Sequence, residues 1–298
     1  MSALPKLPSD LVGLAHQVDP LSRRGFFMTA SAAATAGYTL AAGPVRADAI
    51  HTDATGLSAG DAKVKVSDGE MPAYFARPAN AQNPPVILVA FEVFGLHEYI
   101  KDLTRRLAKV GALAVAPDYY FRKDDLTKIA DGAQVQAIVN TKTDAELVSD
   151  LDATVAWAKQ QGGDFSRLGI LGNCRGGRTA WIYSAHNPDL KAAVAFYGPL
   201  VDPPALKPIL PKSATELAPE MKAPVLGLYG EADAGIPVAQ VEAMKAALAA
   251  AHKTADFKIY PGAPHGFLAD YRPSYRKEAA EDGWALAVAW FKKYGVLS

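Results

Sequence analysis

Gly172-Asn173-Cys174-Arg175-Gly176-Gly177 follows an apolar run at residues 167–171. The run predicts a strand, and the six residues predict a sharp turn from that strand into a helix, because glycines on both sides of Cys174 leave room for a tightly bent backbone. Such a turn presents its central side chain beyond the sheet, and the helix dipole with its free N–H groups favours thiolate over thiol there. We therefore predict that Cys174 is a nucleophile, with a buried structural cysteine as the alternative.

Strand-like and helix-like segments alternate on both sides of this turn. Continuous apolar runs, typical of strands buried on both faces, occupy residues 86–91, 112–116 and 225–229. A hairpin at 63–66 and 73–77 precedes them, and further strands are predicted at 192–196 and 256–260. Helices are predicted at 99–109, 126–139, 144–161, 179–186, 238–251 and 275–293.

This alternation predicts an α/β fold with one mostly parallel central sheet and helices on both faces. No repeat or change of composition divides residues 48–298, which we predict to form a single domain. Ligands of such sheets bind beyond the carboxyl ends of the strands. The side chains that directly follow each strand are therefore the candidates for chemistry.

The composition of the 298 residues is that of an ordinary globular protein, with 50% hydrophobic side chains. The 31 basic and 31 acidic side chains give a formal net charge of zero, which argues against a nucleic-acid partner. Cys174 is the only cysteine, so neither an intrachain disulfide nor a cysteine-rich zinc site can form. No metal motif is present in the sequence, and we predict no cofactor.

Residues 1–47 are predicted to be a twin-arginine export signal. Arg23 and Arg24 precede an Ala-rich, weakly apolar run at 29–42, and small residues lead to a possible cleavage point after Ala47. A membrane-spanning helix is the alternative, but the apolar run falls short of the ~20 residues that a span needs. We therefore expect a periplasmic or other extracytoplasmic protein, with the twin-arginine translocase as a partner and membrane contact only through an uncleaved leader.

A cysteine nucleophile needs a base, and the base needs a group that orients it. His265 lies in a turn rich in Gly and Pro after the strand at 256–260, and Asp233 follows the strand at 225–229, with Glu231 as its local competitor. We predict that His265 is the base and Asp233 its partner. The other histidines are predicted to lie at the surface or at helix ends: His16, His51, His97, His186 and His252.

Glu92 stands out because a carboxylate follows an apolar strand and precedes two more apolar residues. Burial of an ionised carboxylate is costly. Glu92 is therefore either an edge residue that reaches solvent or a functional group across from Cys174 with a raised pKa.

The same glycine-rich turn has a second interpretation. Residues 172–179 fit G-x-x-x-x-G-R-T, a near match to a phosphate-binding loop in which Arg178 replaces the lysine. A nucleotide hydrolase is therefore one alternative. A second is a non-catalytic exported protein in which Cys174 acts as a thiol sensor.

Five segments together resemble the dienelactone hydrolase family of the α/β-hydrolase fold, in family order from about residue 60 to the C-terminus. They are Phe91-Glu92-Val93-Phe94-Gly95, Ala116-Pro117-Asp118-Tyr119-Tyr120-Phe121-Arg122, the turn around Cys174, Gly230-Glu231-Ala232-Asp233 and Pro264-His265-Gly266-Phe267. The resemblance implies a Cys174–His265–Asp233 triad. It also implies that Glu92 holds the resting thiol and that the backbone N–H groups of Val93 and Arg175 form the oxyanion hole.

By the same resemblance the protein is a carboxylic ester hydrolase that opens an enol-lactone or activated ester through a thioester acyl-enzyme. A general carboxylesterase with the same triad is the closest alternative. The family binds a substrate carboxylate with two arginines, and Arg122 matches the first of them. The second position, four residues after His265, holds Ala269. Either Arg272 replaces the missing arginine, or the pocket has less preference for anions.

Overall fold

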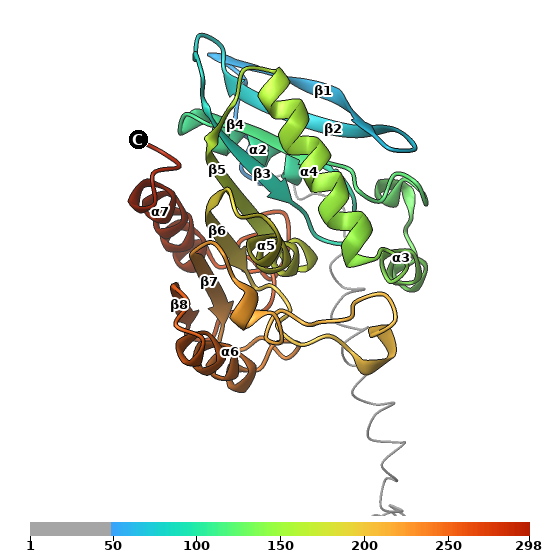
Figure 1. The fold of residues 1–298 in the computed structure, drawn as a ribbon, viewed down its shortest axis with the longest axis vertical. Helices are drawn as coiled ribbons and strands as arrows, with labels where there is room; N and C mark the ends of the chain where they lie inside the picture. Colours follow the sequence, from blue (N-terminus) through green and yellow to red (C-terminus); the bar gives the residue numbers. More distant parts are fainter. Residues whose placement is uncertain (1–48) are drawn as a thin grey trace, which may run out of the picture.

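The computed structural model describes residues 49–298, which build one eight-stranded sheet in the order β1-β2-β4-β3-β5-β6-β7-β8 (Figure 1). The strands are β1 (Leu57–Val66), β2 (Gly69–Pro78), β3 (Pro85–Ala90), β4 (Leu113–Pro117), β5 (Asp164–Asn173), β6 (Leu190–Phe196), β7 (Val225–Gly230) and β8 (Ala255–Tyr260). Strands β1 and β2 form an antiparallel hairpin, β2 pairs antiparallel with β4, and all other neighbours are parallel. The export signal predicted at 1–47 and its cleavage point lie outside the described residues.

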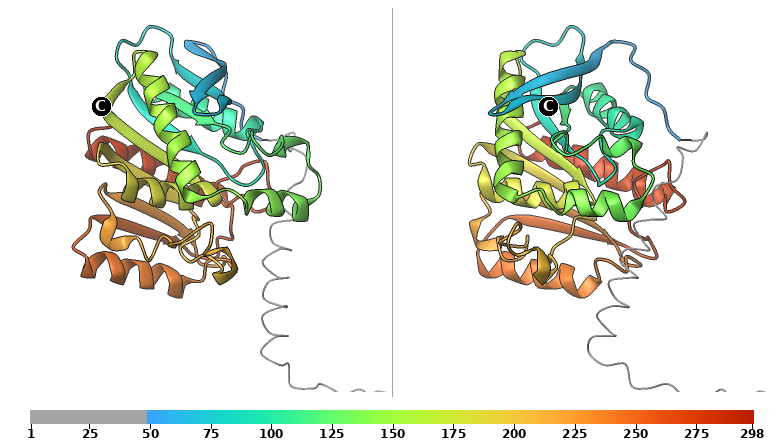
Figure 2. Two further views of the ribbon diagram at one scale, coloured as in Figure 1. Left: turned by 45° about the vertical axis from the view of Figure 1, so that its right-hand side comes forward. Right: turned by 90° about the vertical axis from the view of Figure 1, so that its right-hand side faces the viewer.

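Helices cover both faces of this sheet, as the alternating sequence pattern predicts. The helices α4 and α5 pack on one face and α2 and α7 on the other, while α6 packs against the edge strand β8 (Figures 1 and 2). Their bounds are α2 (Glu98–Lys109), α3 (Gly132–Val139), α4 (Asp144–Gln160), α5 (Arg175–His186), α6 (Val238–Ala250) and α7 (Lys277–Lys293). The chain is therefore an α/β hydrolase fold with a mostly parallel sheet.

The strands at the centre of the sheet are sealed from solvent. Every residue of β3, β4 and β7 is buried, which agrees with their continuous apolar sequences. The edge strand β8 instead alternates between more and less exposed positions. The core thus lies on both sides of the parallel strands and holds their carboxyl ends in fixed positions.

One predicted helix is divided in the structure. The segment 126–139 contains a single turn of 3-10 helix at Leu126–Lys128, and α3 begins only at Gly132. The cause is Asp131, whose side chain accepts a hydrogen bond from the backbone N–H of Ala133 and so starts a new helix. The apolar spacing alone did not reveal this break.

The glycines around Cys174 allow α5 to touch the sheet backbone. A Cβ atom on Gly172 would lie 1.9 Å from the carbonyl oxygen of Gly176, and one on Gly176 would lie 2.0 Å from the carbonyl oxygen of Ala90. No side chain fits in either place. The first turn of α5 therefore packs directly against the carboxyl end of β3, which brings the loop after β3 beside Cys174.

Candidate active site

Five chemically active side chains follow the carboxyl ends of neighbouring strands. Glu92 lies two residues after β3, Cys174 directly after β5, Tyr197 directly after β6, Asp233 three residues after β7 and His265 five residues after β8. These strands are adjacent in the sheet order β3-β5-β6-β7-β8. Because parallel strands end at the same edge of a sheet, the five side chains converge there.

Cys174 has a strained backbone at the sharp turn that the sequence predicts. Its φ of 56° and ψ of −122° are unusual for a residue with a side chain, and it forms the N-cap of α5. Hydrogen bonds hold this conformation: its N–H donates to Phe196 O at 3.0 Å, and its carbonyl accepts from Gly177 N at 2.8 Å. The residue is buried, with only 1% of its surface exposed.

Asp233 orients the imidazole of His265. The distance from His265 Nδ1 to Asp233 Oδ2 is 2.7 Å, and the other carboxylate oxygen accepts from the backbone N–H groups of Gly235 and Ile236 at 2.9 and 3.1 Å. Because an ionised carboxylate can only accept, Nδ1 carries the proton. The competing Glu231 instead accepts from the N–H of Gly262 at an exposed position.

The imidazole of His265 also interacts with Cys174. Burial lowers the pKa of His265, but attraction to the sulfur of Cys174 and hydrogen bonds with Asp233 and Cys174 outweigh it and raise the pKa to about 10. Such an imidazole is positively charged at neutral pH. An imidazolium beside a sulfur atom is the arrangement that cysteine nucleophiles use in general.

Glu92 is fully buried, so it is not an edge residue that reaches solvent, and its pKa is lowered rather than raised as the sequence led us to expect. Its Oε2 atom accepts hydrogen bonds from Arg272 Nη2 at 2.7 Å and from the hydroxyl of Tyr271 at 2.8 Å, and His97 Nε2 lies 3.7 Å away. Burial raises the pKa of Glu92, but attraction to Arg272 and the contacts with His97 and Tyr271 outweigh it and lower the pKa to about 2. The sequence did not indicate these partners.

The hydrogen bonds of Glu92 within the described residues do not include one to Cys174. The contact with the resting thiol that the family resemblance implies is therefore not formed in this structure: Arg272 and Tyr271 bind Oε2, and the buried Oε1 makes no hydrogen bond to another described residue. Arg272 is itself 5% exposed, and its guanidinium carbon lies 4.8 Å from the ring centroid of Phe94. Arg272 lies in the site, as expected, but it is paired with the protein's own carboxylate.

Arg122, the match to the family's first substrate arginine, is also paired internally. Its Nε and Nη2 atoms bind Asp68 at 2.6 and 2.8 Å, and its Nη1 and Nη2 atoms bind Asp150 at 2.8 and 2.9 Å. Arg122 is therefore held by the protein's own carboxylates, and its role in binding a substrate stays a prediction. The carboxylates come from the β1–β2 turn and from α4, two elements whose contact the sequence did not predict.

The start of α5 contributes two further arginines. Arg178 is 1% exposed and binds both oxygens of Asp202 at 2.8 Å and those of Asp144 at 2.6 and 3.0 Å. It is not available for a nucleotide phosphate, which argues against the phosphate-loop interpretation. Arg175 Nη1 lies 4.0 Å from Asp202. Arg175 is the first residue of α5, so its backbone N–H is one of those without a partner in the helix.

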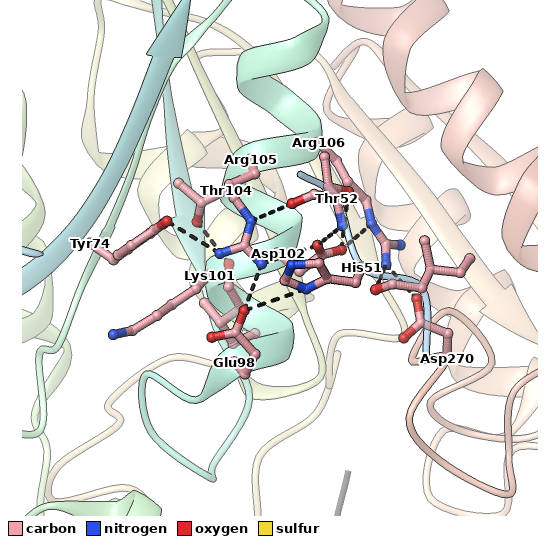
Figure 3. Close-up of polar contacts among 12 residues, drawn as sticks. His51, Thr52, Tyr74, Glu98, Lys101, Asp102, Thr104, Arg105, Arg106 and Asp270 are labelled. Carbon is pink, nitrogen blue, oxygen red and sulfur yellow. Dashed lines mark hydrogen bonds and ion pairs between the residues drawn. The ribbon is translucent and has the colours of Figure 1, made fainter. Parts of the chain in front are cut away.

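An ion network on α2 reaches Asp270, which directly precedes Tyr271 in the chain (Figure 3). Arg106 binds both Asp102, at 2.6 Å, and Asp270, the residue just before Tyr271. Asp102 also accepts from the backbone N–H of Thr52 at 2.5 Å, which fixes the start of the described chain on α2. The network positions the partners of Glu92 from outside the site.

Sequence reasoning missed Tyr271, and it placed His97 at a helix end, where it lies, but missed its contact with Glu92. His51, His186 and His252 are exposed, as predicted. His97 precedes α2, but its side chain makes no capping hydrogen bond, is only 15% exposed and faces Glu92. Its sequence neighbours carry no signal for this contact, because Glu92 and His97 meet through the bend of the loop after β3.

The described residues contain neither a candidate metal site nor a candidate membrane span. Within 49–298, no group of three His, Cys, Asp or Glu side chains is placed to hold a metal ion. In the same range, no helix combines the length and apolar character needed to cross a membrane.

Comparisons with known proteins agree with the fold. The model of the dienelactone hydrolase family matches residues 71–295. A "Putative carboxymethylenebutenolidase" of Methylorubrum extorquens is 52% identical over 292 residues, covering 97% of this chain and 98% of the relative. A protein of the same name from Escherichia coli K12 is 45% identical over 261 residues, covering 87% of this chain and 96% of the relative.

A solved structure from Klebsiella pneumoniae, described as a "Putative Dienelactone Hydrolase", superposes with a TM-score of 0.77 at 48% identity. The superposition covers 80% of this chain and 99% of that one. The family model and the relatives span nearly the whole of the described fold. The chain therefore belongs to the dienelactone hydrolase family and is a hydrolase that acts on lactone or ester bonds.

Proposed function

We propose that this hydrolase opens an enol-lactone or activated ester through a Cys174–His265–Asp233 triad and a thioester acyl-enzyme. The observation that carries the proposal is the position of His265, which contacts Asp233 at 2.7 Å through one ring nitrogen and interacts with the strained Cys174. This is the nucleophile, base and orienting-group arrangement that covalent acyl transfer requires.

The first half of the reaction forms the thioester. The thiolate of Cys174 attacks the carbonyl carbon, and the carbonyl electron pair moves to its oxygen. The backbone N–H groups of Val93 and Arg175 stabilise that oxyanion. Collapse of the intermediate breaks the bond to the leaving oxygen, which takes a proton from the imidazolium of His265 and departs as an enol or alcohol.

The second half releases the acid. Neutral His265 accepts a proton from water, and the resulting hydroxide attacks the thioester carbonyl. The carbon–sulfur bond breaks, the acid is released, and the thiolate–imidazolium pair is restored. Asp233 binds the protonated Nδ1 of His265 and so keeps the imidazole ring oriented through both halves of the reaction. The tetrahedral intermediate expels its better leaving group, and a thiolate leaves more readily than an amide nitrogen. Activated esters therefore suit this chemistry better than amides.

The same experiment distinguishes this proposal from two alternatives. A general carboxylesterase would use the same triad on simple aryl esters. A non-catalytic thiol protein would show no ester turnover and would instead form sulfenic acid at Cys174 reversibly.

The test compares wild-type protein with Cys174→Ala on p-nitrophenyl acetate and on a dienelactone. We expect the substitution to lower kcat about 1000-fold or more, because it removes the nucleophile. Circular dichroism and the melting temperature check that the fold persists. Equal rates for the two proteins would overturn the proposal, and faster turnover of simple aryl esters than of the dienelactone would favour the carboxylesterase.

We also propose that residues 1–47 direct export through the twin-arginine translocase. Arg23, Arg24 and the small residues before Asp48 support it. The full chain should yield a periplasmic protein whose first residue is Asp48, and replacing both arginines by lysine should keep it in the cytoplasm. Mass spectrometry of the fractionated protein measures both. Periplasmic delivery of the double-lysine variant would refute this signal.

A further inference from the structure

The hydroxyl of Tyr197 is a buried polar group that no other described residue satisfies. Tyr197 is fully buried, and its hydroxyl makes no hydrogen bond within the described part of the chain. Tyr183 is equally buried, but its hydroxyl donates to Asp152 Oδ1 at 2.9 Å. The hydroxyl of Tyr229 likewise donates to Gly198 O at 3.1 Å. A buried hydroxyl without a partner lowers the stability of a fold, so its presence calls for a functional reason.

The backbone places Tyr197 beside the proposed base. Tyr197 directly follows β6 and has a φ of 37°, in the left-handed region that residues with side chains rarely adopt. Its N–H donates to Leu228 O at 2.7 Å, and a Cβ on Gly198 would lie 2.4 Å from the carbonyl carbon of Gly177 in α5. The ring of Tyr197 meets the ring of His265 edge to face, with 5.0 Å between the centroids. This turn therefore holds the phenol next to the imidazole.

The groups that act electrostatically on the Tyr197 hydroxyl belong to the candidate site. Burial raises the pKa of Tyr197 well above its ordinary value, and interactions with Tyr99, Glu92 and Cys174 raise it further. Arg272 acts in the opposite direction. The phenol keeps its proton at neutral pH, so it is a hydrogen-bond donor directed at the surroundings of the nucleophile.

The chemistry of an ester matches this donor. The Oε1 atom of Glu92 is also buried and unpaired, but it and the Tyr197 hydroxyl do not bond to each other. No acceptor of the described chain therefore takes the proton of Tyr197. The polar part of an ester or lactone consists of two oxygen acceptors, which suit the donor Tyr197 and not the carboxylate Glu92.

We propose that the Tyr197 hydroxyl donates a hydrogen bond to an oxygen of the ester or lactone bound at Cys174, which makes Tyr197 a substrate-binding residue. The inference rests on the proposed ester-hydrolase function and adds a recognition group to it. Cys174 is itself 1% exposed, so an ester that reaches the sulfur enters the same buried surroundings. The donor gives up no protein partner when substrate binds, and its ring already lies against His265. Such preorganised contacts add affinity at little cost.

The first test replaces Tyr197 by phenylalanine, which removes only the hydroxyl oxygen. We expect kcat/KM on p-nitrophenyl acetate to fall about three- to tenfold, the range for one neutral hydrogen bond. Tyr183→Phe is the matched control: it removes a buried hydroxyl that is bonded to Asp152, and it should leave kcat/KM unchanged. A fall of less than about twofold in Tyr197→Phe, or equal falls in both variants, would overturn the proposal.

The melting temperature separates substrate binding from a structural role. Tyr197→Phe removes an unpartnered hydroxyl, so the melting temperature should stay the same or rise. Tyr183→Phe loses the hydrogen bonds with Asp152 and Asn187 and should melt about 2 to 4 °C lower. An equal drop in Tyr197→Phe would show that its hydroxyl is already satisfied in the free protein and would refute the proposal.

A binding measurement distinguishes this proposal from the proposed function. A ligand-detected NMR titration of the Cys174→Ala protein gives the dissociation constant of p-nitrophenyl acetate without turnover. We expect this constant to be about three- to tenfold larger when Tyr197→Phe is added. That result supports the proposal even if the wild-type protein hydrolyses no ester, an outcome that would count against only the proposed function. Equal constants, or no binding to Cys174→Ala, would contradict the role of Tyr197.

Discussion

The site contains two charged pairs with the same separation and different properties. His265 and Asp233 are 2.7 Å apart, as are Arg272 and Glu92. The side chain of His265 is 26% exposed and touches Cys174, whereas that of Glu92 is fully sealed. The pKa of His265 is raised to about 10, and the pKa of Glu92 is lowered to about 2.

The cation in each pair explains the difference. A guanidinium does not lose its proton in proteins, so the Arg272–Glu92 pair stays charged and holds the loop after β3. An imidazole can release its proton when its neighbour changes charge, so the His265–Asp233 pair can take part in proton transfer. The first pair is therefore expected to act mainly on stability and the second mainly on rate.

The largest expected effect comes from breaking the His265–Asp233 pair. Asp233→Asn should lower kcat on p-nitrophenyl acetate by about 1000-fold or more, because an amide facing Nδ1 favours the wrong tautomer of His265. The melting temperature should change little, since the amide oxygen still accepts from Gly235 and Ile236. Glu231→Gln, in the same loop, is the control and should retain activity. A loss below tenfold in Asp233→Asn would contradict this role.

The second largest effect is expected from breaking the Arg272–Glu92 pair. Glu92→Gln should lower the free energy of unfolding by about 3 to 5 kcal/mol, because Arg272 is left buried without a counter-charge. Denaturant titration at neutral pH measures this. The double variant Glu92→Gln with Arg272→Met should recover part of the loss. A change below about 1 kcal/mol in the single variant would mean that solvent reaches Arg272.

The pH dependence of stability sharpens the comparison further. The pKa of Glu92 falls from an ordinary 4.5 to about 2 on folding, so the stabilisation is complete above pH 4.5 and is lost as pH falls from 4.5 to about 2. Its size is about 3 kcal/mol. The free energy of unfolding, measured across this pH window, should fall more steeply for the wild-type protein than for Glu92→Gln. Parallel curves would refute a depressed pKa.

The smallest effect concerns the titration of His265. Cys174→Ala removes attraction to the sulfur and one hydrogen bond, while burial, which opposes the charge, remains. The pKa of His265 should therefore fall by at least about one unit. Nitrogen-15 NMR of the imidazole across a pH titration measures it in both proteins. An unchanged pKa would show that Asp233 alone sets the charge of His265.

Local sequence signals were sufficient for the fold and for the residues proposed as the triad. Buried apolar runs marked the parallel strands, and Gly- or Pro-rich turns marked the strand ends where Cys174, Asp233 and His265 lie. These features are set by neighbours in the chain. The strained φ of 56° at Cys174 agrees with the turn that its glycines predict.

The charge partners could not be predicted in the same way. Glu92 and Arg272 are separated by 180 positions, and Arg122 meets Asp68 and Asp150 from two other elements. Which carboxylate binds which arginine depends on side-chain packing between elements, and the sequence contains several possible partners for each. The family resemblance assigns Arg122 to substrate binding, but it carries no information on the carboxylates that Arg122 meets.

The contact between Gly176 and the carbonyl of Ala90 couples two loops mechanically. Backbone touches backbone there, so the start of α5 and the segment after β3 are expected to move as one body. Val93 and Arg175, whose N–H groups are proposed to meet the oxyanion, lie on opposite sides of this junction. Their spacing is then set by a backbone contact rather than by a side chain.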